Sequence, residues 1–316
     1  MPPLSRQHIT VEKRREYSGH TGSIYAMIAS RDEACLYSGG DDGLLVRWDL
    51  TDDAAEGEAL LRTERAIFAL LDIPAHDLLV AGSSDGTVYF LDLGTRRLVH
   101  TFRKSTQSVF ALYYDPGHDL LWVLQGKGGL SLLRPGTWEE RGWLHLVEDH
   151  LRAAEPGPDG LCYVASSDRH ILAIDRETLA LRHRWEAHAH SVFCLRQHPA
   201  GTYLLSGGRD AYLRAWHPAD HTPQQALPAH NFTVNDIAFD PSGGYFATAS
   251  RDKTLKLWDA RTFDLLKVVD FARNAGHTHS VNKIVWLKAD NSLLSCGDDR
   301  RIIRWYFNIE RYDNPT

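Results

Sequence analysis

The chain has 316 residues, with 35 Lys and Arg against 41 Asp and Glu and a formal net charge of -6 at pH 7. This acidic balance argues against non-specific nucleic-acid binding, which depends on basic patches. No segment approaches the ~18 apolar residues of a membrane-spanning helix, and residues 1–17 contain no apolar run typical of a secretion signal. We therefore expect a cytoplasmic protein that binds neither nucleic acid nor membranes.

One pattern of four short strands repeats along the chain. Its marker is a turn residue, which recurs at Asp42, Asp85, Lys127, Asp168, Asp210, Asp252 and Asp299. The successive gaps are 43, 42, 41, 42, 42 and 47 residues. A period in the forties with four strands in each copy is typical of a radial β-propeller and not of a helical solenoid. The copies account for almost all of residues 1–316, so we expect a single domain.

The two ends of the chain are predicted to meet in the last copy. Eighteen residues precede Gly19, and only eleven follow Trp305, too few for a turn and a full outer strand. We predict that residues 7–16, with HITVEKRR from His8 to Arg15, form the outer strand of the seventh copy. Such closure protects sheet edges that would otherwise pair with other chains.

The first copy is acidic. Between Arg31 and Glu58, nine Asp and Glu residues stand against two Arg, enough to explain the whole charge imbalance. The simplest interpretation is a solvated edge that aids solubility, and the alternative is docking of a basic partner.

Copies two to four lack three polar residues that the other copies share. Where the others have His, these copies have Thr63, Ser105 and Leu146; where the others have Ser or Thr, they have Ala81, Val123 and Val164; and where the others have Trp, they have Leu91, Leu133 and Ile174. Joint loss of a polar network can be nearly neutral, whereas losing one member leaves the others unpaired. We therefore expect true blades with apolar cores, although Lys127 replaces Asp in the third copy and polar residues occupy 148–152 in the fourth.

The sixth copy, Ala229 to Ala260, shows the pattern most fully. Alternating apolar residues predict strands at Val234–Phe239, Tyr245–Ala249 and Thr254–Trp258, separated by turns rich in Pro, Gly, Ser and Asp. After it, the longest gap carries five extra residues in the connector DFARNAGH, before His277. We interpret them as a surface loop on the same face as the Asp turns.

Constant offsets from the marker connect these copies to a known family. The offsets hold for Trp six residues after it, Ser or Thr four before it and His twenty-two before it. Together with the pairs Gly19-His20, Gly276-His277, Trp48-Asp49 and Trp258-Asp259, the pattern resembles WD40 repeats over almost the whole chain. The resemblance implies a seven-bladed β-propeller of four-stranded antiparallel blades around a central channel.

The resemblance also implies one hydrogen-bonded tetrad in each intact blade. The four tetrads would be His20, Ser38, Asp42 and Trp48; His188, Ser206, Asp210 and Trp216; His230, Thr248, Asp252 and Trp258; and His277, Ser295, Asp299 and Trp305. Buried polar groups must be paired, and these four groups can satisfy one another in a line.

A candidate partner site lies five residues after the His position. The seven copies have Tyr25, Phe68, Phe110, Leu151, Phe193, Asn235 and Asn282 there. In six copies, apolar residues flank this position with a spacing of three, which indicates a β-bulge. The resemblance places the position at the channel mouth, on the face that grips peptides, with a rim of mixed charge that includes Arg209 and Arg251.

Two interpretations of the aromatic residues remain open. Exposed rings would form a cation–π surface for an Arg, Lys or methylated side chain, while Asn235 and Asn282 could hydrogen-bond a peptide backbone. Alternatively, the rings pack between neighbouring blades.

No pattern of metal ligands or of a catalytic site is evident. His190 and His279 lie two residues after His188 and His277, but the latter pair belongs to the tetrads, so we expect no metal. The four cysteines, Cys35, Cys162, Cys194 and Cys296, lie in predicted strands without metal-type spacing and are interpreted as reduced core residues. Residues 126–129 lack the spacing of a phosphate loop.

These observations favour a non-catalytic protein-interaction scaffold without a cofactor. We expect a monomeric propeller within a larger complex, binding a peptide or protein segment at the channel mouth. The alternatives are a propeller enzyme, a hydrolase or lyase with a metal or small-molecule site in the mouth, and a nucleic-acid adaptor, which the acidic first copy disfavours.

Overall fold

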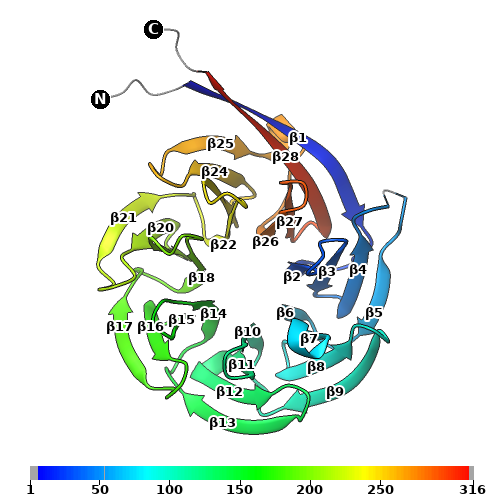
Figure 1. The fold of residues 1–316 in the computed structure, drawn as a ribbon. Helices are drawn as coiled ribbons and strands as arrows, with labels where there is room; N and C mark the ends of the chain where they lie inside the picture. The colour runs from blue at the N-terminus through cyan, green and yellow to red at the C-terminus, as the bar shows by residue number, and fades with distance from the viewer. Residues whose placement is uncertain (1–5, 53, 313–316) are drawn as a thin grey trace.

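The computed structural model describes residues 6–52 and 54–312. Its strands form seven four-stranded antiparallel sheets arranged around a central axis (Figure 1). In six sheets the strand nearest the axis comes first in the chain and the following strands add outward. The predicted seven-bladed β-propeller is therefore confirmed.

The first four blades use strands β2 to β17. Blade one contains β2 (Ile24–Ala29), β3 (Cys35–Gly40), β4 (Leu44–Asp49) and β5 (Glu58–Arg62). Blade two contains β6 (Ile67–Ile73), β7 (Leu78–Ser83), β8 (Thr87–Asp92) and β9 (Arg97–Arg103). Blade three contains β10 (Val109–Asp115), β11 (Leu120–Gln125), β12 (Gly129–Arg134) and β13 (Glu139–His145). Blade four contains β14 (Leu151–Pro156), β15 (Leu161–Ser166), β16 (His170–Asp175) and β17 (Leu181–Glu186).

The last three blades use the remaining strands and include the first one. Blade five contains β18 (Val192–Gln197), β19 (Leu204–Gly208), β20 (Tyr212–Trp216) and β21 (Pro223–Pro228). Blade six contains β22 (Val234–Phe239), β23 (Tyr245–Ser250), β24 (Leu255–Asp259) and β25 (Leu265–Val269). Blade seven contains β26 (Val281–Trp286), β27 (Leu293–Gly297), β28 (Arg301–Tyr312) and β1 (Arg6–Ser18). The helical turns are η1 (Pro74–His76), η2 (Gly126–Gly128) and α1 (Phe271–Asn274).

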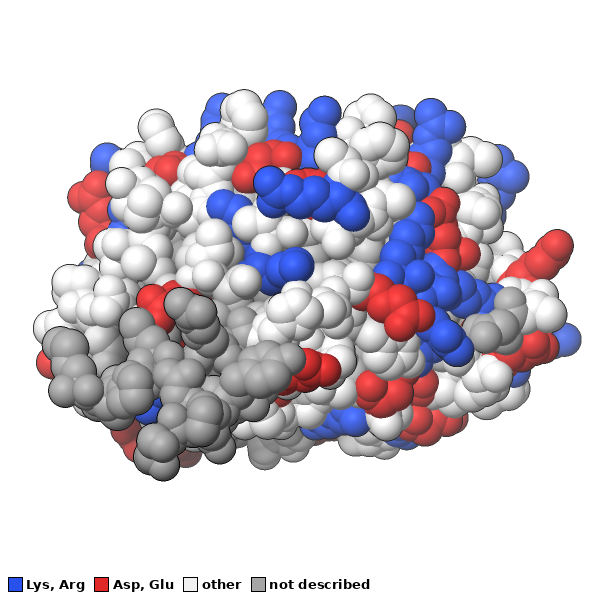
Figure 2. Space-filling model, turned by 90° about the horizontal axis from the view of Figure 1, so that it is seen from above, with Lys and Arg blue, Asp and Glu red and all other residues white. Residues whose placement is uncertain are grey.

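The N-terminal strand closes the ring, as predicted from residues 7–16. β1 pairs antiparallel with β28, with Lys13 opposite Trp305, and the two strands run outward together from blade seven (Figure 1). The apolar side of this ribbon packs inward, since Ile9 is buried in the same cluster as Trp286 and Trp305. Its outer side is charged, and Figure 2 shows Lys and Arg interleaved with Asp and Glu on this edge of the molecule. Charged side chains on an outer strand oppose pairing with a further chain.

The core lies between adjacent blades. Each sheet is covered on both faces by its neighbours, so the second strands are buried at almost every position. Between blades seven and one, for example, Met27, Leu36 and Trp48 pack with Leu294 and Ile302. Fully burying one such side chain contributes about 1.5–3 kcal/mol, so the contacts between blades dominate the stability of the ring.

Blades two to four have the apolar interiors that the sequence predicts. Ala81, Val123 and Val164 are fully buried, and Leu91, Leu133 and Ile174 are at most 2% exposed. The four cysteines are buried thiols in β3, β15, β18 and β27. Burial raises the pKa of the Cys162 thiol, which keeps it protonated and unreactive.

The connector before His277 forms one short helix. Asp270 caps α1 by accepting a hydrogen bond from the Arg273 backbone N–H at 2.8 Å. The connector leads from β25 to β26 and ends at His277, which contacts the Asp299 turn, so the extra residues lie on the Asp-turn face as predicted. Within residues 6–52 and 54–312, no helix is long and apolar enough to span a membrane.

Candidate functional site

Four blades contain a chain of polar contacts among the residues of the tetrads. In blade one, His20 Nδ1 lies 3.0 Å from Asp42 Oδ2, His20 Nε2 lies 2.7 Å from Ser38 Oγ, and Trp48 Nε1 donates to Ser38 Oγ at 2.8 Å. Blades five, six and seven repeat the arrangement with His188, Ser206, Asp210 and Trp216; His230, Thr248, Asp252 and Trp258; and His277, Ser295, Asp299 and Trp305. The spacing of these residues therefore places them together inside single blades.

Each tetrad pairs a buried imidazole with an ionised carboxylate. Burial alone would raise the pKa of the Asp252 carboxyl, but hydrogen bonds from His230 and Thr254 hold that pKa well below its usual range. Burial lowers the pKa of His230, so this imidazole is neutral at pH 7. The same carboxylate accepts the backbone N–H of Asn231, which ties the turn to the start of the inner strand. These groups are satisfied within the blade and stabilise the fold.

A β-bulge interrupts the inner strand of every blade. The pairing of the first two strands shifts register between Ile24 and Ala26, and the equivalent shift recurs in the other six blades. The bulge predicted from the apolar spacing is thus confirmed. The bulged residues, which we call the bulge ring, are Tyr25, Phe68, Phe110, Arg152, Phe193, Asn235 and Asn282.

The prediction for blade four was wrong by one residue. Leu151, expected in the ring, is fully buried in the core, and Arg152 occupies the bulge. The physical reason is the β14–β15 hairpin, which is one residue shorter than in the other blades. The bulge therefore lies 16 and not 17 residues before the marker Asp168, and Val147 and not Leu146 stands five residues before the bulge. Both residues are apolar, and only the pairing of Ala153 with Ala165 identifies the register.

The aromatic members of the bulge ring contact one another around the mouth. Tyr25 and Phe68 pack edge to face with ring centroids 5.2 Å apart, and Phe68 stacks parallel to Phe110 at 5.7 Å. The rings of Tyr25, Phe68 and Phe110 are half-buried, and so is that of Phe193. Phe68, Phe110 and Phe193 line a central cavity of ≈ 640 Å³. The rings therefore pack across neighbouring blades and also present surface to the cavity.

Arg152 continues this ring between two phenylalanines. Its guanidinium carbon lies 4.2 Å from the centroid of the Phe110 ring and 5.1 Å from that of Phe193. Its Nε donates to Ser167 Oγ at 2.7 Å, and burial lowers its pKa from the ordinary arginine value. The polar run at 148–152 was the only signal of this residue in the sequence.

The two asparagines of the bulge ring bind to neighbouring blades. Asn235 Nδ2 donates to the Val281 carbonyl at 2.8 Å, and Asn282 Nδ2 donates to the Ile24 carbonyl at 2.9 Å and to Asp298 Oδ1 at 2.8 Å. Their amide N–H groups thus connect blades six, seven and one, which leaves fewer donors for a peptide backbone than the sequence analysis expected.

The rim around the mouth is divided by charge. Arg209 and Arg251 are exposed at the turns of blades five and six, and the side chain of neither has a hydrogen bond or ion pair with the described residues. Asp41 and Asp298 hold the equivalent positions of blades one and seven. The mouth is therefore basic on one side and acidic on the other.

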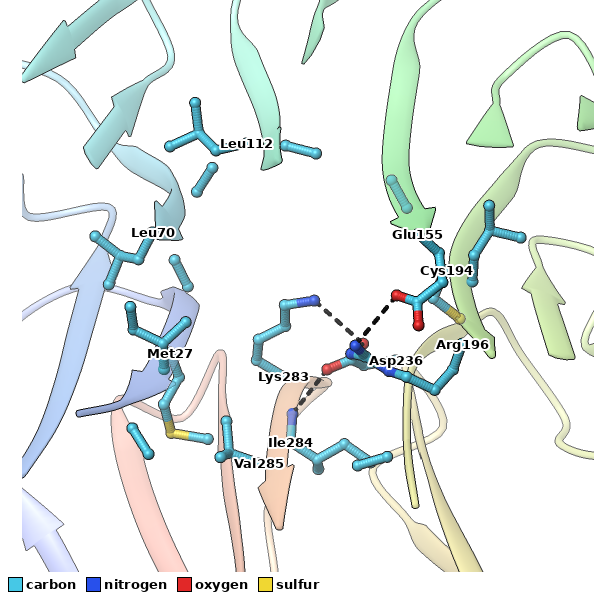
Figure 3. A pocket seen from close by; sticks show the side chains of 18 of the residues that line it. Met27, Leu70, Leu112, Glu155, Cys194, Arg196, Asp236, Lys283, Ile284 and Val285 are labelled. Carbon is cyan, nitrogen blue, oxygen red and sulfur yellow. Dashed lines mark hydrogen bonds and ion pairs between the residues drawn. The ribbon is translucent and has the colours of Figure 1, made fainter. Parts of the chain in front are cut away.

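Below the ring, four charged residues of alternating sign line one side of the cavity (Figure 3). Arg196 Nη1 lies 3.4 Å from Glu155 Oε2, and Lys283 Nζ lies 3.1 Å from Asp236 Oδ1. Burial raises the pKa of Glu155, and the Glu155 carboxylate raises the pKa of Arg196. The four residues come from blades four, five, six and seven, one from each. The sequence analysis missed this chain because its members lie about forty residues apart.

The intact blades match a known family. A model described as "WD domain, G-beta repeat" matches residues 11–49, 180–217, 221–259 and 270–305, and each segment contains one complete tetrad. The chain is a WD40-repeat protein.

Striatins are similar to this WD40 chain. Striatin of Rattus norvegicus and Striatin of Homo sapiens are each 27% identical to it over 285 residues, which cover 81% of this chain and 36% of the relative. Striatin-4 of Homo sapiens is 26% identical over 275 residues, which cover 79% of this chain and 36% of the relative. The chain thus spans about a third of the length of these relatives.

The WD40 segments that the family model matches leave out blades two to four. These blades nevertheless have the same four strands and the same bulge as the matched ones. They also supply three consecutive members of the bulge ring, Phe68, Phe110 and Arg152. The part of the ring with the least typical sequence is therefore the part that carries most of the aromatic and cationic surface at the mouth.

Proposed function

We propose that this WD40 propeller is a non-catalytic scaffold that binds a peptide or protein segment at the channel mouth, on the Asp-turn face. The observation that carries the proposal is the bulge ring, in which half-buried aromatic side chains line a cavity. Rigid aromatic surface around a concave site is typical of binding hot spots, because it can bury area with little loss of side-chain entropy.

The charged residues of the cavity support binding over catalysis. Glu155 and Asp236 are each held by an ion pair, and Asp236 Oδ2 also accepts the Ile284 backbone N–H at 3.1 Å. A hydrolase or lyase needs an acid or base free to exchange a proton with substrate. We propose that these charges join neighbouring blades, and that the propeller works as a monomeric unit of a larger protein complex.

We place this function in the cytoplasm. The four buried cysteines are free thiols, as expected of a protein that works in a reducing compartment.

The test compares the mouth with a matched outer surface. Random peptides displayed on phage are selected on the immobilised wild-type protein and then offered to the Phe110→Ala/Phe193→Ala double variant. We expect the double variant to lose the selected peptides. Trp143→Ala serves as the control, because Trp143 is a 47% exposed aromatic residue on the outer strand β13, away from the mouth.

Two outcomes would contradict the proposal. Peptides retained by a folded double variant would place the interface elsewhere, first on the acidic edge of blade one or on the connector that contains α1. A large loss of melting temperature in the double variant, without a change in peptide binding, would mean that the rings serve only as core.

A further inference from the structure

Arg152 has no ion pair at the mouth with the described residues, although the charge of Asp149 acts on it and favours its charged form. Of the five N–H donors of a guanidinium, the Nε donor bonds to Ser167, and the described residues provide no other hydrogen-bond acceptor and no ion pair for this side chain. Its terminal nitrogens are therefore free to donate. Phe68, Phe110, Phe193 and Arg152 all line the same cavity, so these donors lie at a surface that a ligand can reach.

Three partly buried arginines near the cavity and the turns show the usual arrangement. Arg196 pairs with Glu155, Arg214 donates to Asp210 at 2.8 Å, and Arg301 donates to Asp299 at 2.7 Å. A partly buried charge is costly unless it is paired, and proteins normally supply the counter-charge themselves. Arg152 departs from this arrangement, because Asp149 acts on it without forming an ion pair, and a counter-charge in direct contact is what a ligand would bring.

The surroundings hold the guanidinium in place. Phe110 and Phe193 stack on it, and Ser167 accepts from Nε, so three contacts fix its orientation before any ligand arrives. The same stacking occupies the aromatic faces that could otherwise receive a cation from a partner. The ring therefore favours an anion at this position over the Arg, Lys or methylated side chain that the sequence analysis considered.

The charged residues of the rim also favour an anionic ligand at this position. Lys127 is exposed at the turn of blade three, and its backbone N–H contacts His150, whose ring lies 5.2 Å from that of Phe110. Arg209 and Arg251 follow at the turns of blades five and six. Basic residues therefore lie on both sides of Arg152, whereas Asp41 and Asp298 lie at blades one and seven.

We propose that Arg152 is an anion-recognition residue, and that the mouth takes a peptide segment whose carboxylate or phosphate accepts hydrogen bonds from the terminal nitrogens of Arg152. This proposal rests on the proposed function, since it specifies the chemistry of the peptide that binds at the same mouth. Carboxylate and phosphate share the planar pair of acceptors that fits an arginine fork.

The experiment uses four pools of degenerate peptides that differ in one fixed central residue, which is Glu, phosphoserine, Ser or Lys. Retention of each pool is measured on immobilised wild type, Arg152→Gln, Arg152→Lys, Arg209→Gln and Phe68→Ala. We expect wild type to retain the Glu or the phosphoserine pool about tenfold better than the Ser and Lys pools, because a charge-assisted hydrogen bond is worth at least this factor. Which of the two anionic pools is retained identifies the anion.

The variants separate Arg152 from general basic charge. Arg152→Gln is expected to lose the preference for an anion and to retain all four pools alike. Arg209→Gln, the matched exposed arginine of the same face, is expected to change retention by about twofold at most, because an exposed charge is screened by salt. Circular dichroism checks that each variant is folded, and Arg152→Lys, which keeps the charge without the fork, decides the question if the Gln variant unfolds.

The outcomes also separate this inference from the proposed function. Equal retention of all pools by wild type, with loss in Phe68→Ala, would leave the mouth as a binding site and overturn the role of Arg152. An anion preference that persists in Arg152→Gln would do the same. Retention of no pool by wild type, or retention that Phe68→Ala leaves unchanged, would overturn both.

Discussion

Replacing Thr248 by Val tests the polar chain of blade six with almost no change of shape. The Thr248 side chain is fully buried, and its Oγ1 lies 2.7 Å from His230 Nε2 and 2.9 Å from Trp258 Nε1. Valine leaves both nitrogens buried without a partner, at about 1–3 kcal/mol for each. We expect the free energy of unfolding to fall by roughly 2–5 kcal/mol, a large part of the ~5–15 kcal/mol of a typical folded domain.

The assay is urea denaturation followed by tryptophan fluorescence and circular dichroism, on wild type and Thr248→Val. Thr262→Val is the matched control, because Thr262 is an exposed threonine of the same blade whose hydroxyl bonds to Asp264 at the surface. Its expected effect is within about 0.5 kcal/mol. A loss below about 0.5 kcal/mol for Thr248→Val would refute the reasoning, since the stranded imidazole and indole would then carry no cost.

Four further predictions concern pH, ring closure and the cavity. Burial lowers the pKa of His188 and His230, so the unfolded chain binds more protons below about pH 6.5, and we expect the melting temperature to fall from pH 7 to pH 5; a flat profile would contradict this. A second fall of the melting temperature is expected below about pH 4, where the carboxyls of the unfolded chain are protonated while Asp252 in the folded protein resists protonation. Deleting residues 1–16 should expose the edge of β28 and cause aggregation or a large loss of stability, and a stable monomer in size-exclusion chromatography would refute closure. Asp236→Asn should lower the free energy of unfolding by about 1–3 kcal/mol by removing the counter-charge of Lys283, and a neutral effect in urea denaturation would contradict the pairing.

The constant spacing within one repeat, through the resemblance to WD40 repeats, was enough to predict the local contacts of the intact blades. His230, Thr248 and Trp258 lie within one blade, and strand length and turn geometry bring residues at such separations together in every copy. The bulge was predictable for the same reason, because apolar residues three apart cannot share one face of a regular strand.

The register of blade four was beyond this reasoning. Without a His, Leu146 and Val147 are equivalent in sequence, and a shift of one residue exchanges a core position for a position at the mouth. The pairing of β14 with β15 decides between them and places Arg152 beside Phe110 and Phe193.

The sequence by itself determined the number of blades and the closing strand, because these follow from a repeated spacing along the chain, and it determined the tetrads through the resemblance to WD40 repeats that the same spacing carries. Only the tertiary structure decided which side chains meet across blades. Glu155, Arg196 and Asp236 are about forty residues apart from one to the next, and a local pattern carries no information on contacts of that range. The ring brings equivalent positions of consecutive blades side by side, and it thereby creates both the charged chain in the cavity and the arginine among the aromatic residues of the mouth.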